Sequence, residues 1–296
     1  MRLVTFRDPG VDGDRLGVLR DDGHVIDLTA DADDESPRTL LDLLRAGPSG
    51  LDWARSALDG ASGESVRRLD GIRLRAPLPR PNSIRDFMLV EEHVRNSFGS
   101  IPAEWYEIPA YWKGNCDTVF GPDDTIPWPS YTDKLDYELE VGAIIGRRAF
   151  RVDVEEAAAC IAGYTIFNDW SARDIQFREM KIGLGPGLGK DFATSFGPCM
   201  TTADAIDITV APMRARINGE VWSEGSVGSM RFSFPDVVAH LSREQPLLPG
   251  DVLGSGTIGR GCGLELDRWL EPGDVVELEV DGIGVLRNRV GSKGMK

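Results

Sequence analysis

Two acidic residues, Glu138 and Glu140, lie two positions apart in the segment KLDYELEV, residues 134–141. On a β-strand, side chains two positions apart point to the same face, so these carboxylates would lie together while the apolar residues between them face the core. Neighbouring carboxylates repel each other, and a cation bound between them relieves this repulsion. Oxygen ligands without a nearby Cys or His suit Mg²⁺, Mn²⁺ or Ca²⁺ better than Zn²⁺. Taken alone, the pattern is more typical of a solvated edge strand with two exposed acids, and only later features of the chain favour the cation.

The composition limits the classes of partner. The chain has 296 residues, of which 41% are hydrophobic, and its formal net charge is −15. This length provides a sizeable core in one large domain or in a small and a large one. Binding to nucleic acid or to an anionic membrane surface requires a basic surface, and none is visible. No apolar run approaches membrane-spanning length, and the first residues lack the apolar stretch of a signal peptide. We therefore expect a cytoplasmic protein that acts on a small molecule.

Cysteine and histidine are too sparse to build a soft metal site. The histidines are His24, His93 and His240; we expect His24 and His240 to be structural. The four cysteines form no CxxC pair, so neither a structural zinc site nor a dense disulfide frame is expected. We expect reduced, mostly buried thiols at Cys116, Cys160, Cys199 and Cys262.

A proline-rich connector, RAPLPRP (75–81), divides the chain into two expected domains, 1–75 and 76–296. Residues 1–75 read as a small α+β unit with three short strands and two short helices. The second unit reads as strand-rich. It has three expected helices: one over 154–161 that Asp153 caps, one over 171–180 that a Ser171–Asp174 capping box opens, and one over 235–242. Its expected strands include 163–167, 206–210, 213–217 and 275–280.

Two glycine-rich stretches resemble nucleotide-binding motifs but fail their requirements. In GLGPGLGK (183–190), Leu184 stands where a P-loop requires Gly, and Asp191 stands where it requires Ser or Thr. GSGTIG (254–259) fits the dinucleotide fingerprint formally, but no apolar helix follows it. We therefore expect no nucleotide site.

The order of several motifs resembles the fumarylacetoacetate hydrolase family over about residues 75–290. The resemblance is carried by Arg85-Asp86-Phe87 with His93, the Glu138-x-Glu140 pair, the block NDWSARDIQ (168–176), Gly189-Lys190 and PGDVLGSGT (249–257). It implies a β-sandwich roll catalytic domain, usually assembled as a homodimer. The expected fold is thus α+β and β-rich, with this domain preceded by the small N-terminal one.

The resemblance also implies a site. It assigns Asp86, Glu138, Glu140 and Asp169 to a divalent cation, usually Mg²⁺, with Mn²⁺ or Ca²⁺ also possible. Four converging carboxylates would repel each other strongly without such an ion, so the chemistry and the resemblance agree. The resemblance further implies that His93 is the general base, that Glu265 orients it, and that Lys190 is catalytic. It also implies that the substrate is contacted by Arg173, Gln176, Thr194 and Thr257.

Simpler roles remain open for three of these residues. Arg173 could pair with an acid on its own helix, Lys190 could be a solvated loop residue, and Glu265 could be an exposed strand acid. The chain also departs from family patterns. Met88 and Met180 replace tyrosines of fumarylacetoacetase, and Asn96 stands where many relatives that cleave acylpyruvates carry a glutamate. Methionine donates no hydrogen bond, so the far end of the substrate is expected to be held differently from fumarylacetoacetate.

The implied function is a Mg²⁺-dependent hydrolase that cleaves a carbon–carbon bond in a 1,3-dicarbonyl or 2,4-dioxo acid, such as an acylpyruvate, through an enolate held by the metal. The same site could serve a decarboxylase, an isomerase or a hydratase of a related oxo acid or hydroxydienoate. A metal-stabilised binding protein without catalysis is a further alternative.

Overall fold

The largest element of the fold is a twelve-stranded sheet. The computed structural model describes residues 1–30 and 32–294. Neighbouring strands of the sheet are antiparallel, except that β17 runs parallel to β6 and β14 parallel to β8. The order is β4 (Val66–Arg68), β3 (His24–Asp27), β2 (Arg15–Leu19), β1 (Arg2–Arg7), β14 (Thr194–Thr202), β12 (Ile161–Asp169), β11 (Glu140–Ile145), β17 (Asp251–Gly254), β6 (Ser83–Phe87) and β7 (Tyr111–Gly114), with β5 (Arg73–Leu74) on β1 and β8 (Val119–Phe120) on β14.

A second sheet of five strands packs on the first, as β14 lies against β19 and β12 against β18. The main hydrophobic core lies between the two sheets and includes Val141 and Ile166 from one sheet and Leu278 from the other. The fold is therefore α+β and strand-rich, as expected. The second sheet has the order β16 (Glu220–Gly225), β15 (Met213–Ile217), β18 (Val275–Val280), β19 (Gly284–Lys293) and β9 (Thr125–Trp128); a separate pair joins β10 (Leu135–Asp136) to β13 (Ser171–Ala172).

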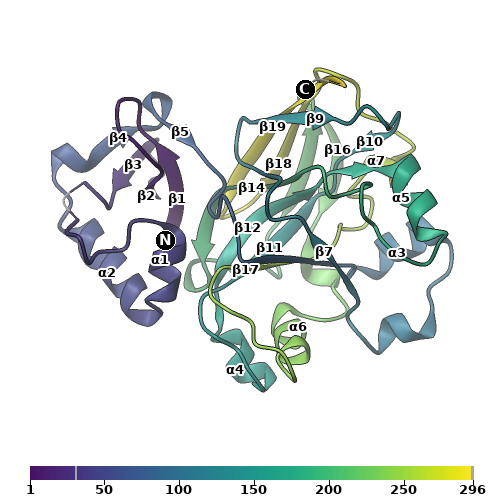
Figure 1. The fold of residues 1–296 in the computed structure, drawn as a ribbon, viewed down its shortest axis with the longest axis horizontal. Coiled ribbons are helices and arrows are strands. Elements are labelled where there is room, and N and C mark those ends of the chain that lie inside the picture. Colours follow the sequence, from purple (N-terminus) through teal and green to yellow (C-terminus); the bar gives the residue numbers. More distant parts are fainter. Residues whose placement is uncertain (31, 295–296) are drawn as a thin grey trace.

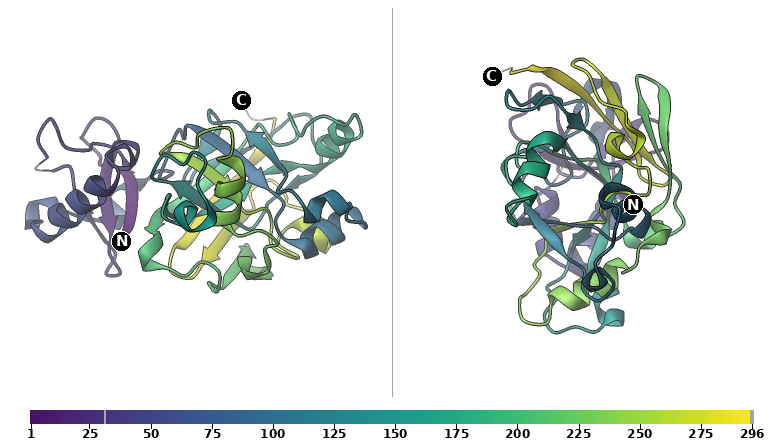
Figure 2. Two further views of the ribbon diagram at one scale, coloured as in Figure 1. Left: turned by 90° about the horizontal axis from the view of Figure 1, so that it is seen from below. Right: turned by 90° about the vertical axis from the view of Figure 1, so that its right-hand side faces the viewer.

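The N-terminal residues form a lobe at one end of the molecule, drawn in purple in Figures 1 and 2. Its strand β1 pairs with β14, so the sheet continues from this lobe into the rest of the chain. Leu3 and Leu16 share a hydrophobic cluster with Phe167 and Met200. The division at residue 75 stays a prediction, and residues 295–296 of the second unit lie outside the described part of the chain.

Three helices lie together beside the end of the large sheet that carries the predicted site (Figure 1). They are α3 (Glu91–Phe98), α5 (Arg173–Met180) and α7 (Gly263–Leu266). Helices α4 (Val154–Ala158) and α6 (Phe234–Leu241) pack on each other elsewhere. The remaining α-helices are α1 (Leu40–Arg45) and α2 (Pro48–Asp59). In the described residues, no helix combines the length and the apolar character needed to cross a membrane.

Most expected elements are present, and three expectations are wrong in detail. Residues 207–210 form a turn, because the Asp207 carboxylate accepts hydrogen bonds from both the amide and the hydroxyl of Thr209. Asp153 caps α4 as expected, but the helix ends at Ala158. Ser171 does not cap α5: it lies in β13, and its hydroxyl donates to the carbonyl of Asp169.

Candidate active site

The acidic pair Glu138 and Glu140 lies inside the protein. Glu138 is 3% exposed and Glu140 0% exposed, which excludes the solvated edge strand. Glu140 begins β11, whereas Glu138 forms an isolated bridge with Cys262. The amide of Glu138 donates to the side-chain carbonyl of Asn168 at 2.9 Å, which fixes the segment against the end of β12. Both carboxylates line one cavity of about 210 Å³, as the alternation of a strand predicts.

Asp86, at the end of β6, joins these two glutamates. One carboxylate oxygen from each of the three residues lies within 4.8 Å of the others. The strands that carry Asp86 and Glu140 flank β17, whose last residue is Gly254. A Cβ atom at Gly254 would lie 2.2 Å from Asp86 Oδ1 and 3.3 Å from Glu140 Oε2. Only a glycine leaves room for these two carboxylates at this point.

Asp169 is linked to the cluster through Lys190. The Lys190 ammonium lies 2.5 Å from both Glu138 Oε2 and Asp169 Oδ2, and the lysine is 4% exposed. A solvated role for Lys190 is therefore wrong. The Lys190 ammonium thus bridges Glu138 and Asp169, two of the four predicted metal ligands. Its positive charge reduces the repulsion between these carboxylates.

Arg173, the first residue of α5, is also buried. Its Nη2 atom lies 2.8 Å from both Asp136 Oδ2 and Glu138 Oε1, so its acidic partners come from the β10 segment and not from its own helix. Its Nη1 atom donates to Gln176 Oε1 at 3.1 Å. Arg173 and Gln176 both line the cavity, as expected of residues that contact a substrate.

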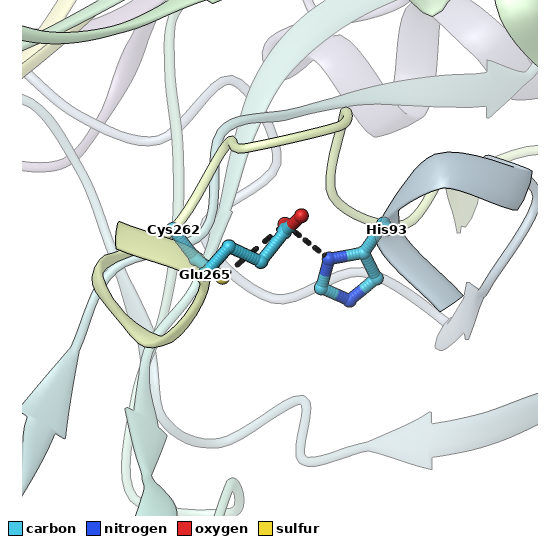
Figure 3. A group of neighbouring side chains, drawn as sticks. All are labelled: His93, Cys262 and Glu265. Carbon is cyan, nitrogen blue, oxygen red and sulfur yellow. Dashed lines mark hydrogen bonds and ion pairs between the residues drawn. The ribbon is translucent and has the colours of Figure 1, made fainter. Parts of the chain in front are cut away.

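His93 and Glu265 form a hydrogen-bonded pair beside these residues (Figure 3). His93 Nδ1 lies 2.6 Å from Glu265 Oε1, and the imidazole lines the cavity. Asn96 donates to the other carboxylate oxygen of Glu265 at 2.7 Å. The Glu265 side chain is fully buried on α7, so the exposed strand acid is excluded. This arrangement holds the imidazole in one orientation, as a general base requires.

The pKa values divide the carboxylates into two groups. Burial raises the pKa of Asp86, and it raises the pKa values of Glu140 and Asp169 well above their usual range. The charge of Glu138 adds to each effect, whereas Lys190 opposes it at Asp86 and Asp169. Burial acts in the same direction on Glu138, but Lys190 and Arg173 outweigh it and hold the pKa of Glu138 well below normal. Burial also acts to raise the pKa of Glu265, but its hydrogen bond from His93 lowers it overall.

Three carboxylate oxygens in this cluster are buried and have no hydrogen-bond partner: Asp86 Oδ1, Glu140 Oε2 and Asp169 Oδ1. An unpaired buried acceptor is costly, and each of these oxygens belongs to a predicted metal ligand. Hard oxygen donors of this number and charge suit a divalent cation. The residues present therefore fit such an ion.

The two threonines differ in their placement. Thr257 lines the cavity, and its hydroxyl donates to Glu140 Oε1 at 3.2 Å. Thr194 pairs with Asp169 across β14 and β12 and is buried outside the cavity lining. The structure thus brings Thr257 to the cavity, whereas Thr194 lies beside Asp169 in the sheet and outside the cavity lining.

Two neighbours of the site, the buried Asp136 and the half-buried Trp112, were missed from the sequence. Asp136 accepts hydrogen bonds from Arg173 Nε and from the amides of Gly263 and Leu264 at the start of α7. Its position, two residues before Glu138, continues the same alternation and could have revealed it. Trp112 donates to Asp86 Oδ2 at 3.1 Å, and nothing in its sequence context signals this contact.

A family model described as "Fumarylacetoacetate (FAA) hydrolase C-terminal" matches residues 83–291, the segment that contains every predicted site residue. The chain belongs to this family. The expected family and the α+β fold are therefore confirmed, and the chain belongs to an enzyme superfamily.

Individual relatives cover nearly the whole chain. Oxaloacetate tautomerase fahd2, mitochondrial, of Xenopus laevis is 33% identical, over 98% of this chain and 90% of the relative. A fumarylacetoacetate hydrolase from psychrophilic Exiguobacterium antarcticum is 28% identical, with a TM-score of 0.80 and 99% of each chain covered. Maleylpyruvate hydrolase from Sphingobium sp. SYK-6, solved with manganese(II) and pyruvate, is 25% identical, with a TM-score of 0.77 and 99% of each chain covered.

Proposed function

We propose that this protein is a Mg²⁺-dependent hydrolase that cleaves a 2,4-dioxo acid at the carbon–carbon bond between C3 and C4, where C4 is the carbonyl carbon farther from the carboxylate. The observation that supports this most is the oriented pair of His93 and Glu265 in the same cavity as the buried carboxylates Asp86, Glu138 and Glu140. A divalent cation held by Asp86, Glu138, Glu140 and Asp169 would polarise the carbonyl groups of the substrate and favour its enolate form.

The proposed reaction uses His93 as the group that moves protons. His93, fixed through Nδ1 by Glu265, takes a proton from water at Nε2. The resulting hydroxide adds to the carbonyl carbon farther from the carboxylate and forms a new C–O bond. The bond between the attacked carbonyl carbon and the adjacent CH₂ carbon then breaks, and its electron pair stays on the pyruvate-like fragment. The CH₂ carbon of that fragment takes up the proton from His93. The products are a carboxylic acid and a 2-oxo acid, so the atoms balance.

Two cations can stabilise the negative charge that develops on the attacked carbonyl oxygen. The Lys190 ammonium and the Arg173 guanidinium both line the cavity and are buried, where their charges act in a low dielectric. Their acidic partners raise the pKa of Lys190 and raise that of Arg173 well above normal, although burial itself opposes this. Both side chains therefore keep their positive charge at neutral pH.

A tautomerase is the second candidate. Relatives that match nearly the whole chain are named oxaloacetate tautomerases. The same His93–Glu265 pair could remove a proton from one position of an oxo acid and return it to another, with no water added and no bond cleaved.

Product analysis distinguishes the two candidates. Purified protein with Mg²⁺ would be incubated with acetylpyruvate and, separately, with oxaloacetate prepared as its enol. Hydrolysis yields equimolar pyruvate and acetate from acetylpyruvate. Accelerated loss of the oxaloacetate enol signal, with acetylpyruvate left intact, would favour the tautomerase and contradict the hydrolase.

We also propose that the protein is a homodimer, as the family resemblance implies. In support, the loop beside the cavity exposes Ile182, Leu184 and Leu188, three large apolar side chains within seven residues. Light scattering after gel filtration tests this proposal: a mass near that of one chain, 32.4 kDa, would contradict it.

A further inference from the structure

The cavity has a charged floor and an apolar mouth. Asp86, Glu138, Glu140, Arg173 and Lys190 line the floor, and all are buried. The half-buried or exposed side chains that line the same cavity are largely apolar; Phe98, for example, is 39% exposed. We call six of them the mouth: Met88, Phe98, Phe177, Met180, Pro186 and Leu264.

Five of these mouth residues come from or adjoin four separate elements around the opening, and the sixth, Pro186, lies in the loop after α5. Met88 follows β6, Phe98 ends α3, Leu264 lies on α7, and Phe177 and Met180 lie on α5. Phe177 and Met180 are three positions apart, which places them on one face of that helix. An apolar surface assembled from several elements favours an apolar group of a bound ligand, because burial of both removes them from water.

Positive charge is confined to the floor. Among the described residues that line the cavity, the positively charged ones are Arg173 and Lys190, and each is already within 2.8 Å of two carboxylates. His93 is paired with Glu265. The hydroxyl groups of Ser97 and Tyr111, which also line the cavity, carry no positive charge. A carboxylate placed in the mouth would therefore lose water without gaining an opposite charge, which is unfavourable.

Resting on the proposed function, we infer that the substrate is a 2,4-dioxo acid whose far end is an apolar acyl or aryl chain rather than a second carboxylate. The 2-oxo acid end lies on the charged floor, and the chain attached to the attacked carbonyl lies against Met88, Phe177 and Met180. Ser97 Oγ, which is buried without a hydrogen-bond partner, is available to an uncharged oxygen of the substrate. This specificity separates the protein from enzymes whose substrate carries a carboxylate at both ends, as oxaloacetate does.

Hexanoylpyruvate and a chain-matched analogue that ends in a carboxylate test this inference by turnover in the presence of Mg²⁺. We expect kcat/KM to be at least about tenfold higher for hexanoylpyruvate, the scale on which an apolar pocket discriminates. Equal values, or a preference for the analogue, would overturn the inference and leave the hydrolase intact.

Binding of uncleavable ligands separates this inference from the proposed reaction. The probes are 2-oxooctanoate and its counterpart with a carboxylate at both ends, titrated calorimetrically in the presence of Mg²⁺. Both lack the second carbonyl group, so the hydrolase cannot cleave them. Tighter binding of the monocarboxylate by about tenfold or more supports the inference even if no dioxo acid is cleaved. Equal affinity for the two ligands would overturn it.

Charge substitutions at the mouth provide the matched comparison. Met180→Arg places a cation in the mouth and should reverse the preference, improving affinity for the dicarboxylate and weakening it for the monocarboxylate. Ser100→Arg is the control, because Ser100 is exposed, lies two residues after Phe98 and is outside the cavity lining. The control adds the same charge and should leave the ratio of affinities unchanged. If both variants shift the ratio equally, the effect is long-range charge and the apolar mouth does not set specificity. Met88→Arg repeats the test from the other side of the mouth if Met180→Arg fails to fold.

Discussion

Asp136 and Arg173 form a buried ion pair in which Asp136 Oδ2 lies 2.8 Å from both Nε and Nη2 of the guanidinium. The same carboxylate accepts the amide hydrogens of Gly263 and Leu264 and so anchors α7, which carries Glu265. One acid thus positions a cation of the floor and, through the helix, the residue that orients His93. Asp136 does not itself line the cavity and acts through these partners, so it is a positioning residue.

Replacing Asp136 with Asn should disturb both partners, because the new amide NH₂ group faces the Arg173 donors or the helix amides. We expect kcat/KM to fall by about 10- to 100-fold, as for other residues that orient a site from behind. The free energy of unfolding should fall by about 3–5 kcal/mol, the usual effect of breaking a buried ion pair. Steady-state kinetics and urea unfolding measure the two effects. The control is Asp133→Asn, since the Asp133 side chain is 83% exposed; wild-type kinetics in Asp136→Asn would refute the positioning role.

Removal of the His93 imidazole tests the general base. His93→Ala should lower kcat by about 10²- to 10⁴-fold, while binding of Mg²⁺ changes little because His93 is not among the four predicted ligands. His240→Ala, which removes a histidine from α6 outside the cavity, is the matched control. Turnover of His93→Ala within a few fold of the wild type would remove His93 from the mechanism.

The raised pKa values of Asp86, Glu140 and Asp169 predict how the metal-free protein responds to pH. These acids retain protons in the folded state at pH values where the unfolded chain has lost them, so stability falls as pH rises above about 4. In EDTA, Glu140→Gln should therefore be more stable than wild type at about pH 8 and similar to it at about pH 5. Thermal unfolding at both pH values measures this difference, and a wild type that is the more stable protein at the higher pH would contradict it.

Mg²⁺ should oppose this loss of stability, because it replaces the protons held between the carboxylates. At a concentration 100 times its Kd, the ion should stabilise the wild-type protein by about 2.7 kcal/mol. The stabilisation should be larger at about pH 8 than at about pH 5, where protons compete for the same oxygens. Glu140→Gln should lose most of this response, whereas an equal response in both proteins would place the ion elsewhere.

We propose that residues 1–75 form a small domain on which the rest of the chain depends, since β1 pairs with β14 and both parts share a hydrophobic cluster. A chain that begins at residue 76 should expose the edge of β14 together with apolar residues such as Met200. Gel filtration and thermal unfolding would show aggregation or a lower Tm than the full chain. Unchanged solubility and Tm would mean that the lobe is energetically independent.

The acidic site was predictable because its chemistry is local in the sequence. The two-residue spacing of Glu138 and Glu140 fixes their common face, and the ordered motifs add Asp86, Asp169 and His93. The contacts of Lys190 and Arg173 were not predictable, because they depend on how a loop and a helix fold back on the β10 segment. The turn at 207–210 was missed because its apolar residues suggest a strand, whereas the Asp207 side chain bonds its own backbone two residues on.

The account depends most directly on where a divalent cation binds. A crystal structure of the protein with Mn²⁺ and a 2-oxo acid, with the ion located by anomalous scattering, measures this position. We predict one peak coordinated by oxygens of Asp86, Glu138, Glu140 and Asp169, with the carboxylate end of the ligand beside it. An ion bound instead at His93, Cys262 and Glu265, the other described group able to hold a metal, or no ion near the four acids, would contradict the central claim.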